Sequence, residues 1–151
     1  MKILITAFAL LLCISLATPA RVSAQIMEMN GTWVLNTEKT IGPSPVKETL
    51  VFDLSEGVQS YTMTSTDADG REGLNEWAID YDGLDHPTST GSGNTASIRR
   101  LGEKTELVIN KRNGQVTSTY TRVLVDNDRT LMSIGRNGDG VIQWVRVFEK
   151  R

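Results

Sequence analysis

This sequence is poor in the residues that cross-link chains, bind metals or span membranes. Its 151 residues contain one cysteine, Cys13, and one histidine, His86. Beyond residue 24 there is no cysteine, so no disulfide framework is expected there. A single histidine excludes a site built from several histidines, and we expect neither a metal nor a cofactor. The one long apolar run, residues 3–17, is too short to cross a bilayer as a permanent helix.

The N-terminal segment has the pattern of an export signal. Lys2 supplies the positive start, residues 3–17 are apolar, and Val22-Ser23-Ala24 offers a small-residue cleavage site. Cys13 follows three leucines rather than a small residue, which argues against a lipid anchor. We therefore predict a signal peptide over residues 1–24 and a single domain over residues 25–151, exported to the periplasm or secreted.

Charge disfavours nucleic acid and anionic membrane as partners. Removal of residues 1–24 takes Lys2 and Arg21 from the 16 basic residues and leaves 14 against 18 acidic ones, a net charge near −4. The remaining basic pairs, such as Arg99-Arg100, are isolated rather than gathered into a patch. We expect a small-molecule partner and no membrane insertion after the signal is removed; the oligomeric state is not predicted.

The rest of the chain reads as short β-strands. Val, Ile, Thr and aromatic residues alternate with polar ones, and Gly, Asn and Asp mark turns about every ten residues. Asn113-Gly114 is the strongest hairpin signal. Pro43 and Pro45 leave no room for a helix over residues 36–45. Because nearly all connections are hairpin-length, we predict an all-β, up-and-down antiparallel barrel of about eight to ten strands without a helical lid. The strands are expected at residues 31–35, 46–54, 59–66, 73–81, 95–101, 105–111, 115–126, 130–136 and 141–149.

Closure of the barrel is expected where the first and last strands meet. Residues 31–35 carry Trp33, and the final run places Ile142, Trp144, Arg146 and Phe148 on one face by strand alternation. A sheet that closes on itself makes its first and last strands neighbours. We therefore predict that these two runs pair.

Three motifs resemble those of the calycin superfamily, the lipocalins and fatty-acid-binding proteins. Gly31-Thr-Trp33 resembles the Gly-x-Trp opening of that superfamily, and residues 146–150 resemble the closing Arg-x-Tyr strand of fatty-acid-binding proteins. Residues 81–87, Tyr-Asp-Gly-Leu-Asp-His-Pro, are similar to a signature of exported bacterial lipocalin-like domains. The resemblance implies a barrel enclosing a small ligand. The sequence departs from fatty-acid-binding proteins in having no room for their helical lid and in having Phe148 at their tyrosine position.

Arg146 has two interpretations. Lipocalins pack an arginine from a late strand across the indole of the Gly-x-Trp motif, so the resemblance implies a structural cation–π contact between Arg146 and Trp33. Alternatively, Arg146 clamps a ligand carboxylate inside the barrel.

Arg122 is the stronger candidate for contacting a ligand. Alternation places it on one face with Tyr120 and Leu124, and if that face points inward the two polar groups form a spot in an apolar cavity. Two alternatives are that the register is opposite, or that Arg122 pairs with Glu48.

Two functions of different class follow. The first is binding of a small hydrophobic or amphipathic molecule, either anionic or uncharged, by the residues Arg122, Tyr120, Arg146, Trp144, Trp77 and Tyr61. The second is an enzyme of cyclase, isomerase or hydrolase type, in which His86 or Glu48 transfers a proton. His86 lies in an Asp-His-Pro loop, where a turn role is the alternative to an acid–base role. The sequence shows no recognisable triad or metal motif and therefore favours binding.

Overall fold

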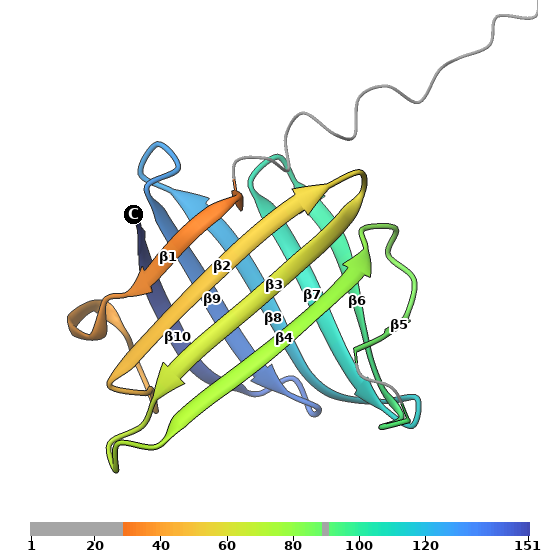
Figure 1. Cartoon of the computed structure of the whole chain (residues 1–151), viewed down its shortest axis with the longest axis horizontal. Coiled ribbons are helices and arrows are strands. Elements are labelled where there is room, and N and C mark those ends of the chain that lie inside the picture. The colour runs from red at the N-terminus through yellow and green to blue at the C-terminus, as the bar shows by residue number, and fades with distance from the viewer. Residues whose placement is uncertain (1–28, 89–90) are drawn as a thin grey trace, which may run out of the picture.

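In the computed structural model, which describes residues 29–88 and 91–151, the chain forms one antiparallel sheet of ten strands (Figure 1). The order in the sheet is β4-β3-β2-β1-β10-β9-β8-β7-β6-β5, so consecutive strands pair with each other except β4 and β5, which are the two edges, and β1 also pairs with β10. The strands are β1 Gly31–Leu35, β2 Lys47–Ser55, β3 Val58–Thr66, β4 Glu72–Asp80, β5 His86–Pro87, β6 Asn94–Gly102, β7 Thr105–Arg112, β8 Gln115–Val125, β9 Thr130–Asn137 and β10 Ile142–Lys150. The predicted up-and-down barrel is confirmed.

The first and last strands close the sheet as the sequence predicts. In β1 and β10, Trp33 lies opposite Lys150 and Leu35 lies opposite Phe148. The remaining edges, β4 and β5, contact each other without pairing, so the barrel is nearly closed. Side chains cover this seam, since Ile79 of β4 packs with Ala96 and Ile98 of β6 in one buried cluster.

One end of the barrel is filled by a hydrophobic core. Its buried members come from the residue pair just before β1 and from β1, β2, β3, β8, β9 and β10: Met29, Trp33, Leu50, Phe52, Tyr61, Leu124, Leu131 and Phe148. The Trp33 indole is fully buried and its Nε1 donates a 2.8 Å hydrogen bond to the Met29 carbonyl, which satisfies the ring's one polar group. These strand segments lie in the upper part of Figure 1.

The segment between β1 and β2 contains only a single 3-10 turn, Thr37–Lys39. Beyond it, Ile41 forms a backbone bridge with Val145, which fixes the loop against β10. The expected absence of a helical lid therefore holds for the described residues. No helix in residues 29–88 and 91–151 is long and apolar enough to cross a membrane. The predicted signal peptide, residues 1–24, lies outside the described residues.

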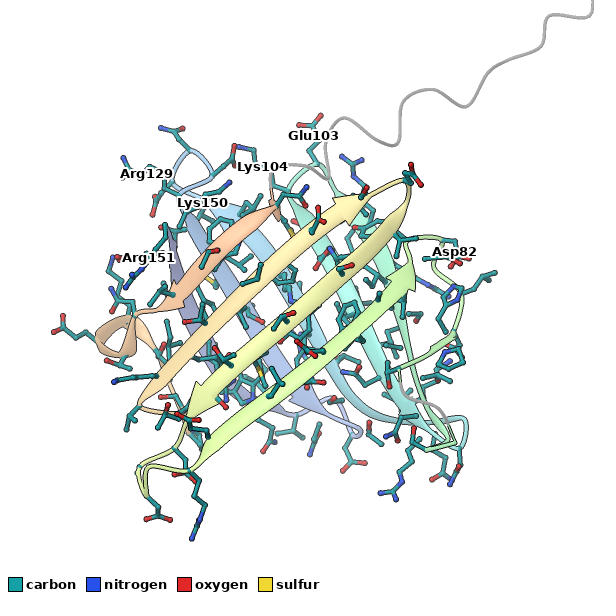
Figure 2. The ribbon with its side chains drawn as sticks, viewed as in Figure 1. Asp82, Glu103, Lys104, Arg129, Lys150 and Arg151 are labelled. Atoms are coloured by element: carbon teal, nitrogen blue, oxygen red, sulfur yellow. The ribbon has the colours of Figure 1, made fainter. Side chains whose placement is uncertain are left out.

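The predicted contact between Trp33 and Arg146 is wrong. Lys150 lies opposite Trp33, and its Nζ is 5.1 Å from the centre of the indole. Figure 2 shows Lys150 at the filled end of the barrel. Arg146 is four positions earlier on β10, which is about 13 Å along a strand, and it covers Trp144 instead. The cation that contacts the Trp33 indole is therefore Lys150, at the rim of the barrel, and not Arg146.

The predicted face of the last strand is correct only from Trp144 onward. Trp144, Arg146 and Phe148 point into the barrel, whereas Ile142 is exposed. A bulge between Ile142 and Trp144 shifts the register against β9 by one residue. One extra residue reverses the side-chain alternation, so Ile142 leaves the interior face.

Candidate functional site

The barrel encloses a cavity of about 560 Å3 on the other side of the core. Leu50, Tyr61 and Phe148 belong both to the core and to the cavity lining, so they form its floor. Asn75, Asn94 and other residues near strand ends also line it, and these ends lie lower in Figure 1. All six side chains predicted to contact a ligand line this cavity: Arg122, Tyr120, Arg146, Trp144, Trp77 and Tyr61.

Arg122 and Glu106 form a buried ion pair beside the floor. They are cross-strand partners on β8 and β7, with 2.8 Å between Arg122 Nη1 and Glu106 Oε1 and side-chain exposures of 3% and 1%. The guanidinium carbon is 4.8 Å from the Phe52 ring centre and 5.1 Å from that of Tyr61. The Tyr81 hydroxyl donates to the other Glu106 oxygen at 3.3 Å. Contacts on several sides fix both charges in place.

This pair corrects one alternative from the sequence. Arg122 faces the cavity, but its carboxylate partner is Glu106 and not Glu48. Sequence reasoning did not single out Glu106. Both faces of β7 carry apolar residues, with Val108 on the Glu106 face and Leu107 and Ile109 on the other, so alternation gives no clear interior face. The signal that could have identified Glu106 is its place on β7, the strand that forms a hairpin with the Arg122 strand β8.

A second ion pair joins Arg146 to Glu48. Arg146 Nη1 lies 2.6 Å from Glu48 Oε2, and Glu48 is buried on β2. The guanidinium carbon of Arg146 is 4.3 Å from the centre of the Trp144 ring. Burial raises the pKa of Glu48 above its usual value, while the charges of Arg146 and Arg122 and the hydrogen bond from Arg146 act to lower it.

Stacked aromatic pairs form two walls of the cavity. Tyr61 and Trp77 are directly opposite each other on β3 and β4, with ring centres 4.8 Å apart. Tyr120 and Trp144, on β8 and β10, have ring centres 5.5 Å apart. In Figure 1, β3 and β4 pass in front of β8 and β9, so the two pairs come from opposite sides of the barrel. The space between them suits an apolar molecule.

Glycine in the intervening strand makes the second wall possible. Gly135 of β9 lies opposite both Tyr120 and Trp144. A Cβ at this position would overlap the Cε2 and Cζ2 atoms of the Trp144 indole. The bare backbone therefore lets the indole cross β9 and reach Tyr120.

Hydrogen bonds connect three polar side chains on the wall that carries Tyr120. Asn110 Nδ2 donates to Ser118 Oγ at 3.2 Å, and that hydroxyl donates to the Tyr120 hydroxyl at 3.3 Å. On the opposite wall, burial raises the pKa of Tyr61 to about 12, so its hydroxyl is neutral at physiological pH. The Nε atoms of Arg122 and Arg146 are buried and have no hydrogen-bond partner among the described residues.

His86 lies apart from these groups. It is not among the described residues that line the cavity, and its Nε2 is 2.8 Å from Asp82 Oδ1 while Nδ1 is 3.9 Å from Asp80 Oδ2. Figure 2 shows Asp82 on the outside of the barrel near β5. The hydrogen bond to His86 lowers the pKa of Asp82. Ligand atoms of these three residues lie within 4.8 Å of one another, a spacing that suits a cation, so the expectation of no metal stays a prediction.

Solved structures show the same fold. No protein-family model and no curated protein sequence matches this chain. The fluorescent protein UnaG is 15% identical with a TM-score of 0.59, covering 83% of this chain and 99% of its own. Lipid binding protein 8 of Caenorhabditis elegans is 16% identical with a TM-score of 0.59, covering 83% and 97%. The REP1-NXSQ fatty acid transporter is 13% identical with a TM-score of 0.58, covering 82% and 96%. The chain therefore has the barrel fold of the lipocalin and fatty-acid-binding protein type.

Proposed function

We propose that this protein binds one small hydrophobic or amphipathic molecule inside its barrel. The observation that carries this proposal is the cavity of about 560 Å3 between the two stacked aromatic pairs. Small-molecule sites in proteins commonly measure about 300–1,000 Å3 and combine an apolar surface with a few placed polar groups. The aromatic walls supply the first, and Arg122, Arg146 and Ser118 supply the second.

The similar structures support the same class of ligand. Two of them are described as a fatty acid transporter and a lipid binding protein, and they share the barrel over almost their whole length. At 13–16% identity this likeness concerns the fold. Ligand binding is therefore inferred from the residues that line the cavity of this chain.

An enzymatic function has weaker support. It requires a proton-transfer group and its partners around one cavity. Glu48 lines the cavity, but it is held by Arg146 at 2.6 Å. His86 is hydrogen-bonded to Asp82 and does not belong to the described lining. The two residues proposed for catalysis therefore do not share the site.

The protein is proposed to act outside the cytoplasm, in the periplasm or secreted. This rests on the pattern of residues 1–24 and on the resemblance of residues 81–87 to exported bacterial lipocalin-like domains. A barrel without disulfides, as the cysteine-free sequence after residue 24 requires, folds in either redox environment.

Fluorescence titration with N-phenyl-1-naphthylamine, an uncharged probe that brightens in apolar sites, tests the proposal. We expect saturable binding of one probe per barrel. Asn75→Trp places an indole at the exposed edge of the cavity and should weaken binding by about tenfold, the effect of losing roughly 1.4 kcal/mol. Glu76→Trp, the adjacent exposed position on the outer face of β4, is the control and should bind like the wild type. Equal binding by all three proteins would place the probe outside the cavity and contradict the proposal.

A further inference from the structure

The charges inside the cavity are already balanced. Arg112 is exposed at the edge of the cavity, and the two guanidiniums that face its interior are each paired with a buried carboxylate, Arg122 with Glu106 at 2.8 Å and Arg146 with Glu48 at 2.6 Å. These four groups together carry no net charge when both pairs are ionised. Taking an unpaired charge into such a site is costly because burial removes it from water.

We propose that the cavity selects ligands whose buried part is uncharged and excludes carboxylates and other anions from its interior. This rests on the proposed function, since it specifies the chemistry of the ligand in that same cavity. An arginine in a barrel interior is by itself a natural anion site. Here an entering anion would have to displace Glu106 or Glu48, and the displaced carboxylate would be left buried without its cation.

The surroundings of Arg122 oppose such a displacement. Glu106 is 1% exposed and also accepts a hydrogen bond from the Tyr81 hydroxyl, so it cannot swing into water. The guanidinium lies over the Phe52 and Tyr61 rings, which holds it beside Glu106. The ion pair is therefore a fixed part of the wall.

The rest of the lining indicates the shape of the ligand. The facing aromatic pairs, Tyr61 with Trp77 and Tyr120 with Trp144, favour a flat, largely apolar molecule between them. The Ser118 hydroxyl also lines the cavity and can bond an uncharged polar group of such a ligand. Neither feature calls for a charge on the buried part of the ligand.

The charged groups at the edge of the cavity differ from those inside. Lys111 Nζ is 2.7 Å from Asp85 Oδ2, and Arg112 is exposed. An exposed charge is weakened by salt at about 0.15 M, whereas buried pairs are screened much less. Binding constants measured at this ionic strength therefore depend mainly on the charges inside the cavity.

Two probes that share one skeleton test the inference. 1-Anilinonaphthalene-8-sulfonate carries a permanent negative charge, and N-phenyl-1-naphthylamine is the same molecule without the sulfonate. The Kd of each is measured near neutral pH for the wild type, Glu106→Gln, Glu48→Gln and the surface control Glu76→Gln. The ratio of the sulfonate Kd to the amine Kd is the readout.

We expect the wild type to favour the uncharged probe. Glu106→Gln and Glu48→Gln each leave a guanidinium without its carboxylate, so the sulfonate should gain about tenfold or more relative to the amine. Glu76→Gln should leave the ratio within about twofold, because an exposed charge contributes little. The double variant Glu106→Gln/Arg122→Met removes both charges and should return the ratio to that of the wild type.

Equal or tighter binding of the sulfonate by the wild type would overturn the inference, whatever the stability of the variants. A ratio that stays unchanged in a folded Glu106→Gln or Glu48→Gln variant would also overturn it. Circular dichroism identifies the folded variants. Failure of both probes to bind the wild type is a different outcome, which contradicts the proposed function itself.

Discussion

The indole of Trp144 lies across the backbone of Gly135, in space that any larger residue would occupy. This contact allows a tryptophan on β10 to stack on Tyr120 of β8, although β9 runs between the two strands. The same indole also lies under the Arg146 guanidinium. One glycine thus places the aromatic wall and, through the indole, the partly buried Arg146.

Gly135→Ala should displace the Trp144 ring. The added methyl group overlaps the indole, and overpacking of this kind costs about 1–3 kcal/mol. We expect a lower urea midpoint, altered tryptophan fluorescence and weaker binding of N-phenyl-1-naphthylamine. Gly102→Ala is the matched control, because its Cβ would meet only Thr105 at ordinary contact distance. Full binding with unchanged fluorescence in Gly135→Ala would show that the ring does not depend on this contact.

Arg122→Leu should destabilise the empty barrel by about 3–5 kcal/mol, because it leaves Glu106 buried and unpaired. The double variant Arg122→Leu/Glu106→Leu removes both charges and should recover most of that loss. Urea denaturation of the three proteins measures the free energies of unfolding. If the single change is neutral while the double change is harmful, the ion pair is not what supports this wall.

Glu48 should make stability depend on pH in a definite direction. Its pKa is raised above 4.5 by burial, so the folded protein holds this proton to a higher pH than the unfolded chain does. The stabilisation is fully present below pH 4.5 and is lost as pH rises through the raised, folded-state pKa. Relative to Glu48→Gln, the free energy of unfolding of the wild type should therefore fall with rising pH. Urea midpoints measured between about pH 4 and 7 check this, and a difference that grows with pH would contradict it.

Trp33→Ala should cost about 3–5 kcal/mol, since it empties a fully buried aromatic site at the filled end of the barrel. Lys150→Met should cost only about 0.5–1 kcal/mol, the scale of an exposed cation–π contact. Thermal melts of the two variants compare the effects. A lysine change as costly as the tryptophan change would mean that the cation itself closes the barrel.

Much of the fold could be predicted because its signals are local. Turn residues every ten positions and the Asn113-Gly114 hairpin predict sequential antiparallel strands, and alternation places Tyr120, Arg122 and Leu124 on one interior face. The structure confirms the barrel and the pairing of β1 with β10.

The partners of the buried charges could not be predicted because they depend on register. Extending the Asn113-Gly114 turn without interruption would place Glu106 opposite Thr121. A bulge between Asn110 and Lys111 shifts the strands by one residue and brings Glu106 opposite Arg122. A second bulge turns Ile142 out of the barrel. Alternation cannot reveal such shifts, because an extra residue changes the face of everything beyond it.

Native mass spectrometry of the protein purified from its own host tests the central claim most directly, namely that the barrel holds one small molecule. We predict a single bound mass per chain, released on collisional activation and recovered as an uncharged, largely apolar compound. Protein that runs at its bare polypeptide mass under gentle conditions, even after incubation with excess N-phenyl-1-naphthylamine, would contradict the account.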